Sequence, residues 1–190
     1  MALLGYDSYL FEEGYLRSIF GDKKRKKLLD IGAWSGSITK IFQPFVDTIF
    51  YLESSYFFRR KLKKMGFSEY KKRENDFDII LMLNLLDRCG DAEKMIDAQL
   101  KNLKEDGTMI ISMPFPINAR HGHGIQNARQ KALSQKQNMS FEKSVSLFYQ
   151  TYLKSKIELI SFSRMPYLIS NPEMGKISIF DNAVFVCQKK

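Results

Sequence analysis

The sequence has few cysteines and no long apolar run, and both absences exclude classes of protein. Only Cys89 and Cys187 occur among 190 residues, too few for a disulfide-stapled fold or a zinc ribbon. No uninterrupted apolar segment approaches the roughly 20 residues of a membrane-spanning helix. The first residues lack the basic and apolar regions of a secretory signal. We therefore expect an intracellular, cytoplasmic protein with reduced thiols, no metal site and no membrane association.

Repeats, low-complexity tracts and linkers rich in Pro, Gly or Ser are absent as well. The chain is nevertheless 44% hydrophobic and 13% aromatic, which is typical of a folded domain of this length. We predict one domain over residues 1–190, in which residues 1–21 form a helical segment packed on the rest, with its helix at Asp7–Phe20. The formal net charge of +9 would suit an acidic partner such as RNA but does not require one.

The alternation of apolar segments with segments of helical spacing predicts an α/β fold. Four short apolar segments have the composition of buried strands; they span residues 28–31, 48–52, 78–83 and 108–113. Strands separated by helices indicate a doubly wound, mostly parallel sheet of the seven-strand type. The last two predicted strands, residues 157–164 and 183–187, leave no room for a helix between them. They are expected to pair as an antiparallel hairpin at one edge.

Helix boundaries are predicted from capping residues and turns. A helix over Ser37–Phe45 is expected after the first central strand, ending at or just beyond its proline. Ser54 and Asp91 are placed to cap the next two helices. Only a rudimentary strand fits at Phe67–Tyr70, before the strand that begins at Asp78.

A glycine turn, Asp30-Ile31-Gly32-Ala33-Trp34-Ser35-Gly36, follows the first central strand. Ligands of open α/β sheets bind at the carboxyl ends of the central strands, where this turn is expected. Glycine allows the backbone to approach a ligand closely, and the N-terminus of a following helix would favour negatively charged groups. Trp34 stands where the dinucleotide-binding pattern has its middle glycine, so the turn alone is weak support for a cofactor site.

Glu53 follows the second central strand, about 20 residues beyond the turn. A carboxylate at this position accepts hydrogen bonds from both ribose hydroxyls of a nucleoside cofactor. Its alternative role is to complement the dipole of the next helix. The turn and the acid together fit NAD and S-adenosylmethionine (SAM) equally well.

The hexapeptide Asn84-Leu85-Leu86-Asp87-Arg88-Cys89 follows the strand at residues 78–83. It places two polar side chains, Asn84 and Asp87, where a substrate would meet the cofactor. Methyltransferases that act on nitrogen often have Asn or Asp here to hold the acceptor amine. The alternative is that Asp87 caps the following helix.

With two further blocks, Arg164–Leu168 and Asp181–Val186, these motifs resemble the methyltransferase-like protein 9 (DREV) family. The blocks occur in family order and span most of the chain from Leu28 onward. The resemblance implies a class I SAM-dependent methyltransferase fold with SAM as cofactor and S-adenosylhomocysteine (SAH) as product. It also implies protein-histidine N-pros (π) methylation of His-x-His motifs in which x is small. The residues that it assigns to SAM are Asp30, Gly32, Ala33, Gly36 and Glu53, and those that it assigns to the acceptor histidine are Asn84, Asp87 and Tyr167.

The implied reaction needs control of one proton more than it needs a strong base. A neutral imidazole attacks the methyl group directly, and its π nitrogen is free to do so only when the τ nitrogen carries the hydrogen. We expect the Asp87 carboxylate to accept a hydrogen bond from that τ N–H, and Asn84 to orient the ring or the substrate backbone. Asn75 and Asp76 are the nearest polar candidates for an adenine contact.

The chain has only two histidines, in Arg120-His121-Gly122-His123-Gly124. Four interpretations stay open: a surface loop, self-methylation at His121 and His123, metal binding, and a catalytic role. The first is the least specific, whereas self-methylation follows from the implied His-x-His substrate.

Two other functions also remain open. Basic clusters at Lys23–Lys27, Arg59–Lys64 and Lys71–Arg73 would suit an RNA methyltransferase. A bulky Trp34 in the glycine turn would suit a binding protein that no longer catalyses. We favour protein-histidine methylation over both.

Overall fold

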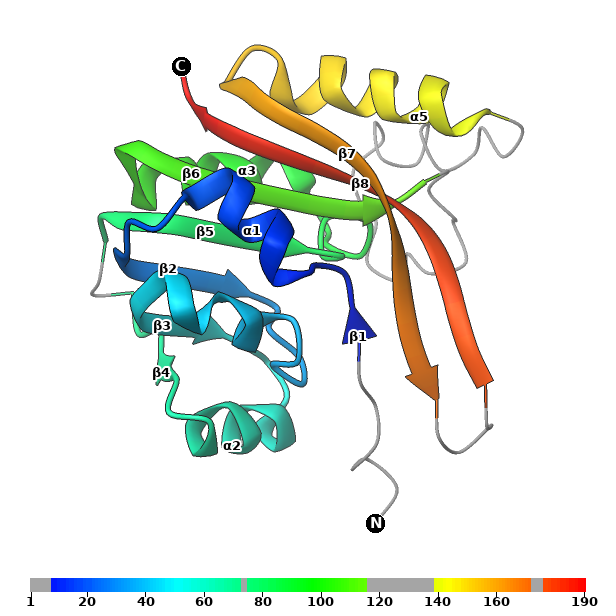
Figure 1. The fold of residues 1–190 in the computed structure, drawn as a ribbon. Helices are drawn as coiled ribbons and strands as arrows, with labels where there is room; N and C mark the ends of the chain where they lie inside the picture. The colour runs from blue at the N-terminus through cyan, green and yellow to red at the C-terminus, as the bar shows by residue number, and fades with distance from the viewer. Residues whose placement is uncertain (1–7, 73–74, 116–138, 172–175) are drawn as a thin grey trace.

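The computed structural model describes residues 8–72, 75–115, 139–171 and 176–190, which form one eight-stranded sheet covered by helices (Figure 1). The strand order is β1-β7-β8-β6-β5-β2-β3-β4. The strands are β1 (Ser8–Tyr9), β2 (Arg25–Ile31), β3 (Val46–Leu52), β4 (Ser68–Glu69), β5 (Phe77–Leu83), β6 (Leu103–Pro114), β7 (Ile157–Asn171) and β8 (Lys176–Lys189). The helices are α1 (Glu13–Phe20), the 3₁₀ helix η1 (Thr39–Phe45), α2 (Tyr56–Lys64), α3 (Ala92–Asn102), α5 (Phe141–Phe148) and the π-helical turn η3 (Tyr149–Leu153).

The centre of the sheet is parallel and its C-terminal side is antiparallel. Strands β4, β3, β2, β5 and β6 run in the same direction, whereas β8 pairs antiparallel with both β6 and β7. This arrangement confirms the predicted doubly wound sheet with an antiparallel C-terminal hairpin. It also places the carboxyl ends of β2 and β5 side by side, at the edge where such folds bind ligands.

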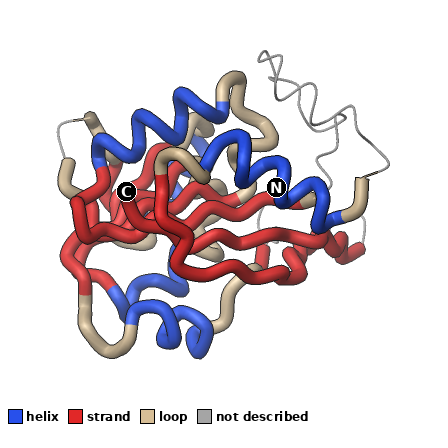
Figure 2. Tube along the Cα trace, turned by 90° about the horizontal axis from the view of Figure 1, so that it is seen from above, coloured by secondary structure: helices blue, strands red, loops and turns tan. Residues whose placement is uncertain are grey.

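Alternate residues of the central strands face two separate hydrophobic clusters. On β2, Leu28 packs with α1, η1 and α2, whereas Leu29 packs with α3 and α5. On β5, Ile79 belongs to the same cluster as Leu28, and Ile80 belongs to the same cluster as Leu29. Figure 2 shows the helices on both sides of the sheet. Because both faces are buried, these strands read as continuous apolar runs in the sequence.

The N-terminal part of the fold corrects two predictions. The helix predicted at Asp7–Phe20 begins only at Glu13, and residue 7 lies outside the described residues. Ser8 and Tyr9 instead form β1, which pairs with Ile169 and Leu168 of β7. The sheet therefore has eight strands among the described residues, where seven were predicted. Pairing with a distant strand overrides local helical preference here, and no local pattern reports it.

The helix after the glycine turn is also different from the prediction. It is a seven-residue 3₁₀ helix, with Ile41 N donating to Ile38 O at 3.1 Å. Pro44 lies inside it and has no N–H to continue an α-helical ladder. An α-helix N-terminus with its aligned N–H groups therefore does not follow the turn, and the anion-binding argument made for it was wrong.

Of the two predicted helix caps, one is confirmed and one is wrong. Asp91 caps α3 as expected, since its Oδ1 accepts from Lys94 N at 3.1 Å. Ser54 does not cap α2, which begins at Tyr56 without a side-chain cap. The Ser54 hydroxyl instead donates to Glu53 Oε1 at 3.4 Å. The rudimentary strand expected near Phe67–Tyr70 is β4.

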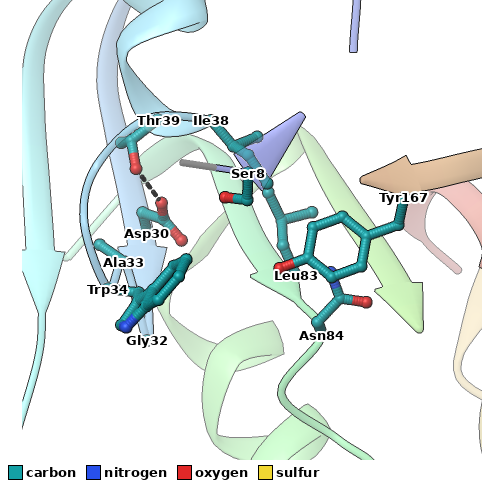
Figure 3. A pocket seen from close by; sticks show the side chains of 10 residues that line it. All are labelled: Ser8, Asp30, Gly32, Ala33, Trp34, Ile38, Thr39, Leu83, Asn84 and Tyr167. Atoms are coloured by element: carbon teal, nitrogen blue, oxygen red, sulfur yellow. Dashed lines mark hydrogen bonds between the residues drawn. The ribbon is translucent and has the colours of Figure 1, made fainter. Parts of the chain in front are cut away.

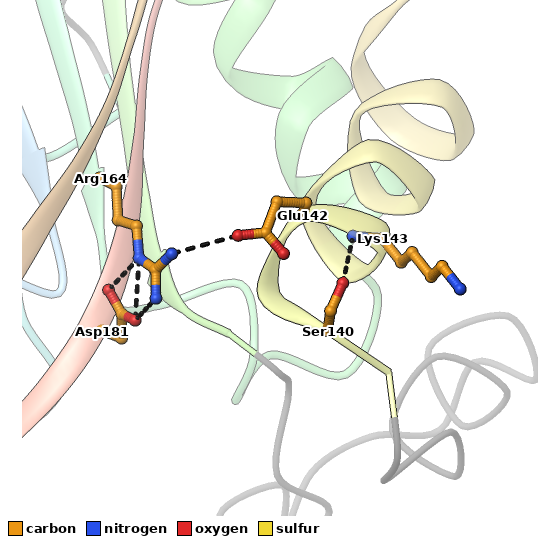
Figure 4. Close-up of polar contacts among 5 residues, drawn as sticks. All are labelled: Ser140, Glu142, Lys143, Arg164 and Asp181. Carbon is orange, nitrogen blue, oxygen red and sulfur yellow. Dashed lines mark hydrogen bonds and ion pairs between the residues drawn. The ribbon is translucent and has the colours of Figure 1, made fainter.

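The C-terminal hairpin is much longer than predicted, and Arg164 joins it to α5. Arg164 Nε donates to both carboxylate oxygens of Asp181 at 2.9 Å, and Nη1 donates to Glu142 of α5 at 3.2 Å (Figure 4). The guanidinium also lies 4.2 Å from the centre of the Phe141 ring. The ion pair holds the pKa of Asp181 below its ordinary value. These contacts tie the register of β7 and β8 to the helix that covers them.

Among the helices of the described residues, none combines the length and apolarity of a bilayer-spanning segment.

Candidate functional site

A cavity lies at the carboxyl ends of β2 and β5, on the sheet face that α1 and η1 cover (Figure 3). The residues that line it come from both ends and the middle of the chain: Ser8, Asp30, Gly32, Ala33, Trp34, Ile38, Thr39, Leu83, Asn84 and Tyr167. They include residues predicted for the cofactor and residues predicted for the acceptor. The parallel sheet therefore brings the two groups of candidates to one place.

Asp30 is the buried acid of this cavity. It is 3% exposed, and its Oδ2 accepts a hydrogen bond from Thr39 Oγ1 at 2.6 Å. Burial raises the pKa of Asp30 to about 7, and the nearby Glu53 carboxylate also raises it, against the Thr39 bond, which lowers it. A cationic ligand group placed beside Asp30 would favour its ionised form. The site can therefore exchange a buried proton for a bound cation.

The glycine turn approaches the cavity with its backbone. Gly32 is exposed at φ +76°, and a Cβ there would lie 3.3 Å from Leu85 Cδ1. Trp34 has the unusual φ of +46°, and its ring packs against Phe58 with centroids 5.5 Å apart. The bulky residue is thus accommodated at the rim of the cavity by an aromatic partner from α2.

Glu53 is held in place by backbone N–H groups. Its Oε2 accepts from Trp34 N at 2.9 Å and its Oε1 accepts from Ser55 N at 2.8 Å. A carboxylate has about four lone-pair sites, so the two backbone bonds fix its orientation, and the remaining sites, one of which takes the long Ser54 bond, can accept ribose hydroxyls. Glu53 does not line the cavity of Figure 3, but it is bonded directly to Trp34, which does. This arrangement fits the ribose of a nucleoside cofactor.

Gly36 has a packing role that the sequence did not indicate. It lies outside the lining of the cavity, at φ +78°, and a Cβ there would lie 2.7 Å from Leu62 Cδ2 on α2. The glycine therefore permits α2 to pack on the turn. Its predicted contact with the cofactor stays a prediction.

Asn84 and Tyr167 form the other wall of the cavity. Asn84 follows β5 at φ +52°, and its backbone N donates to Ser112 O at 2.8 Å. Tyr167 of β7 is buried, and burial raises the pKa of its phenol, while the adjacent Ser8 and Asn84 side chains lower it. In Figure 3 the Tyr167 ring and the Asn84 side chain lie next to each other at the cavity.

Asp87 lies behind this wall and is 5% exposed. Its Oδ2 is 3.4 Å from Arg88 Nε, whereas its buried Oδ1 has no hydrogen-bond partner within the described part of the chain. A buried acceptor without a donor is costly and indicates a ligand or water that completes it. The alternative role, a cap for the following helix, is wrong, because α3 begins at Ala92 and is capped by Asp91.

Several residues of the site had no signal that singled them out. Ser8 fell within a predicted helix, and Thr39 lay inside the helix predicted after the turn. Asn182 contacts Asn84 and was noted only inside a longer block.

Asn75 and Asp76 were the wrong candidates for an adenine contact, because they precede β5 at the opposite edge of the sheet, where Asn75 O accepts from Lys27 Nζ.

The four interpretations of His121 and His123 stay open, since both residues lie outside the described residues. Within the described ranges, no group of three or more His, Cys, Asp or Glu side chains is arranged to hold a metal ion.

Solved methyltransferases share this architecture. The N-methyltransferase NodS from Bradyrhizobium japonicum WM9 aligns with a TM-score of 0.63 and 14% identity, over 93% of this chain and 92% of that one. A putative type 11 methyltransferase from Sulfolobus solfataricus aligns with a TM-score of 0.61 and 21% identity, over 94% and 91%. The complex of NodS with SAH aligns with a TM-score of 0.59 and 14% identity, over 93% and 84%.

The sheet order, the cavity at its carboxyl edge and these similarities define the fold of a class I SAM-dependent methyltransferase. A family model adds the activity, methyl transfer with SAM as the cofactor. The DREV methyltransferase model matches residues 11–189, so the chain belongs to the DREV methyltransferase family.

Proposed function

We propose that this chain is a protein-histidine N-pros (π) methyltransferase that acts on His-x-His motifs in which x is small. The observation that carries the proposal is the buried Oδ1 of Asp87, an acceptor without a donor in the described residues, close to Asn84 at the carboxyl end of β5. An imidazole N–H is a suitable donor for it. The family resemblance supports this choice of acceptor over other N–H groups.

The chain's own residues would determine which imidazole nitrogen carries the proton, whereas the electrophilic methyl group belongs to SAM. SAM supplies, when bound, an electrophilic methyl group, so the protein needs no covalent catalyst. Asp87 would accept a hydrogen bond from the τ N–H of a neutral imidazole and so leave the π lone pair free. As the π nitrogen gains the methyl group the ring becomes an imidazolium, and Asp87 would stabilise its charge until the τ proton passes from the ring to Asp87 and then to water. SAH is the other product.

The residues around Asp87 would bind and orient the substrate. Asn84 would hold the peptide, and the buried Tyr167 would exclude water and close one side of the ring site. On the cofactor side, Asp30 would face a cationic group, Glu53 the ribose hydroxyls, and the backbone of Gly32 and Ala33 the body of the cofactor.

The direct test is methyl transfer from SAM to a peptide that contains Gly-His-Gly-His. Fragment mass spectrometry that separates the two N-methylhistidine isomers should find methyl on the π nitrogen. SAH binding can be followed in parallel through the emission of Trp34, the chain's single tryptophan. Methyl on the τ nitrogen, or SAH binding without any transfer to the peptide, would contradict the proposal; absence of SAH binding would favour the non-catalytic alternative.

Asp87→Asn tests the proton-holding role. The amide keeps the size of the side chain but cannot provide the carboxylate charge, so turnover should fall by about 100-fold or more while SAH affinity changes less than about twofold. Asp91→Asn is the matched control, because Asn also caps helices and Asp91 caps α3 outside the lining of the cavity. Wild-type turnover in Asp87→Asn would remove Asp87 from the mechanism.

Self-methylation at His121 and His123 is a further expectation of the proposed specificity. Protein incubated with SAM should gain methyl mass on the peptide that contains both histidines, and the double variant His121→Ala/His123→Ala should not. An unmodified peptide from an enzyme that methylates Gly-His-Gly-His would exclude it.

A further inference from the structure

Two side-chain amides meet at the cavity: Asn84, which lines it, and Asn182, which does not. Asn182 of β8 is fully buried, and its Nδ2 donates to Asn84 Oδ1 at 2.6 Å. This bond leaves Asn84 Nδ2 and Asn182 Oδ1 buried and, among the residues that the structure describes, without a hydrogen-bond partner. One unused donor and one unused acceptor therefore lie at the back of the site.

The sheet holds this amide pair in a defined position. Asn182 is opposite Met165 of β7 and Pro114 of β6, while the next residues of β7 and β8 on the same face are Tyr167 and Phe180. Asn182 thus faces the same side of the sheet as Tyr167, which lines the cavity. Asn182 is fixed by β-sheet pairing, and Asn84 directly follows the last residue of β5.

Asn84 is held from two strands at once. Its backbone N bonds to Ser112 O of β6, and its side-chain oxygen bonds to Asn182 of β8. Because the oxygen is already used, the amide has only its N–H₂ group left for another partner. The Asn84 side chain is therefore a donor toward the site, whereas the unpartnered oxygen of Asp87 is an acceptor.

We infer that Asn182 is a positioning residue that fixes the Asn84 amide as a hydrogen-bond donor, and that this donor recognises a main-chain carbonyl of the peptide substrate. The inference rests on the proposed function and deepens it. The reacting imidazole offers no acceptor of its own, since its π nitrogen forms the new bond and its τ nitrogen carries the hydrogen. The acceptors that remain in every His-x-His substrate are the backbone carbonyl groups and one nitrogen of the second imidazole, and the carbonyl groups next to the reacting histidine are the nearer to its ring.

Asn182→Asp reverses the polarity of the pair without changing its size. A carboxylate only accepts, so Asn84 must turn its N–H₂ toward residue 182 and present its oxygen to the substrate. In the SAH-bound protein, the Kd for a Gly-His-Gly-His peptide should rise about tenfold, which corresponds to the loss of one hydrogen bond. The Kd for SAH should stay within about twofold, because Asn182 does not line the cofactor side.

Asn84→Asp should produce the same loss of peptide affinity, because it also presents an acceptor to the substrate. Asn102→Asp is the matched control: Asn102 ends α3, and its Nδ2 donates to Gln99 Oε1 at 3.1 Å. This variant should bind the peptide as the wild type does. Its unfolding midpoint, measured beside that of Asn182→Asp, gives the effect of an equivalent change away from the site.

A double-mutant cycle separates positioning from a general structural effect. If Asn182 acts through Asn84, Asn182→Asp should cause no further loss of peptide affinity in an Asn84→Ala background. Asn182→Ser, whose hydroxyl is too short to reach Asn84, serves if the buried carboxylate prevents folding, and should weaken peptide binding by about threefold or more.

Three results would overturn the inference. Wild-type peptide affinity in Asn182→Asp or Asn182→Ser would show that the amide pair does not set substrate binding. An equal loss in the Asn84→Ala background would show that Asn182 acts through the fold. A wild-type protein that binds no His-x-His peptide would remove the proposed function and this inference with it.

Discussion

At the residue scale, the buried carboxyl of Asp30 links the cavity to the stability of the protein. Its folded pKa of about 7 lies above the ordinary value of 3.8, and burial is the main cause. The unfolded chain therefore loses this proton first as the pH rises. Its contribution to the free energy of unfolding is complete below about pH 4 and is lost as the pH rises to about 7, a change of about 4 kcal/mol.

Asp30→Asn should remove that dependence. The amide stays neutral and its oxygen still accepts the Thr39 hydroxyl, so the variant should become more stable than the wild type above about pH 7. Urea unfolding of both proteins between roughly pH 4 and roughly pH 8 measures the difference, which should widen by up to about 4 kcal/mol. Stability curves that run parallel across this range would show that Asp30 is ionised in the folded protein.

Three of the predicted site residues that line the cavity lie in the last two positions of a central strand or directly after it. Asp30, Gly32 and Asn84 could be placed because parallel strands end at one edge of the sheet. Ser8 and Asn182 could not, because their positions depend on β1 and β8 pairing with strands far away in the sequence. Local patterns carry no information about such pairing.

At the element scale, the contact between the glycine turn and α2 depends on one missing side chain. Gly36 combines φ +78° with close approach of Leu62 and Met65, whereas Gly66 has φ +85° and no atom within 4 Å of the position that a Cβ would take. A substitution at Gly66 therefore introduces backbone strain alone, whereas a substitution at Gly36 introduces both strain and steric overlap.

Gly36→Ala should destabilise the protein by about 2–4 kcal/mol, the sum of left-handed backbone strain and overpacking against Leu62. Gly66→Ala carries only the strain and should cost about 1–2 kcal/mol. Chemical denaturation of both variants gives the comparison. Equal losses would mean that Leu62 and Met65 move aside without cost.

The elements that the sequence predicted well are those decided by burial. Runs such as Ile79–Met82 can lie only in a strand covered on both faces. The 3₁₀ geometry of η1 and the length of the β7–β8 hairpin were missed. Pro44 blocks an α-helix although the apolar spacing suits one, and β7 continues through Pro166, a residue type that normally ends strands.

At the scale of the whole molecule, the positive charge is unevenly placed relative to the cavity. Lys23, Lys24, Arg25 and Lys26 lie with Lys104 around Asp78, at the amino ends of β2, β5 and β6. A seven-residue strand spans about 20 Å, so this cluster and the cavity are at opposite edges of the sheet. RNA bound to this cluster would not bring a base to Asn84, whereas the basic residues of α2 lie on the helix whose Phe58 contacts Trp34 at the cavity.

Lys23→Gln/Lys26→Gln should therefore leave kcat/KM for the His-x-His peptide within about twofold of the wild type. If the protein binds RNA at this cluster, the same change should reduce the slope of log affinity against log salt by about one per lysine. Peptide methylation and RNA binding measured over a salt series test both statements. A large loss of peptide methylation would show that this edge of the sheet takes part in substrate binding.

The strand order has a consequence for the nascent chain. β8 is inserted between β6 and β7, yet it is synthesised after both, and β1 must wait for β7 before it can pair. Until β8 arrives, β6 is an apolar strand with an open edge, which is a template for aggregation. The half of the molecule that carries Asp30 and Glu53 can assemble on the ribosome while Tyr167 and Asn182 are still missing. Translation products that stop before β8 should therefore require chaperones, and the residues proposed to bind the methyl acceptor are the last that folding brings into place.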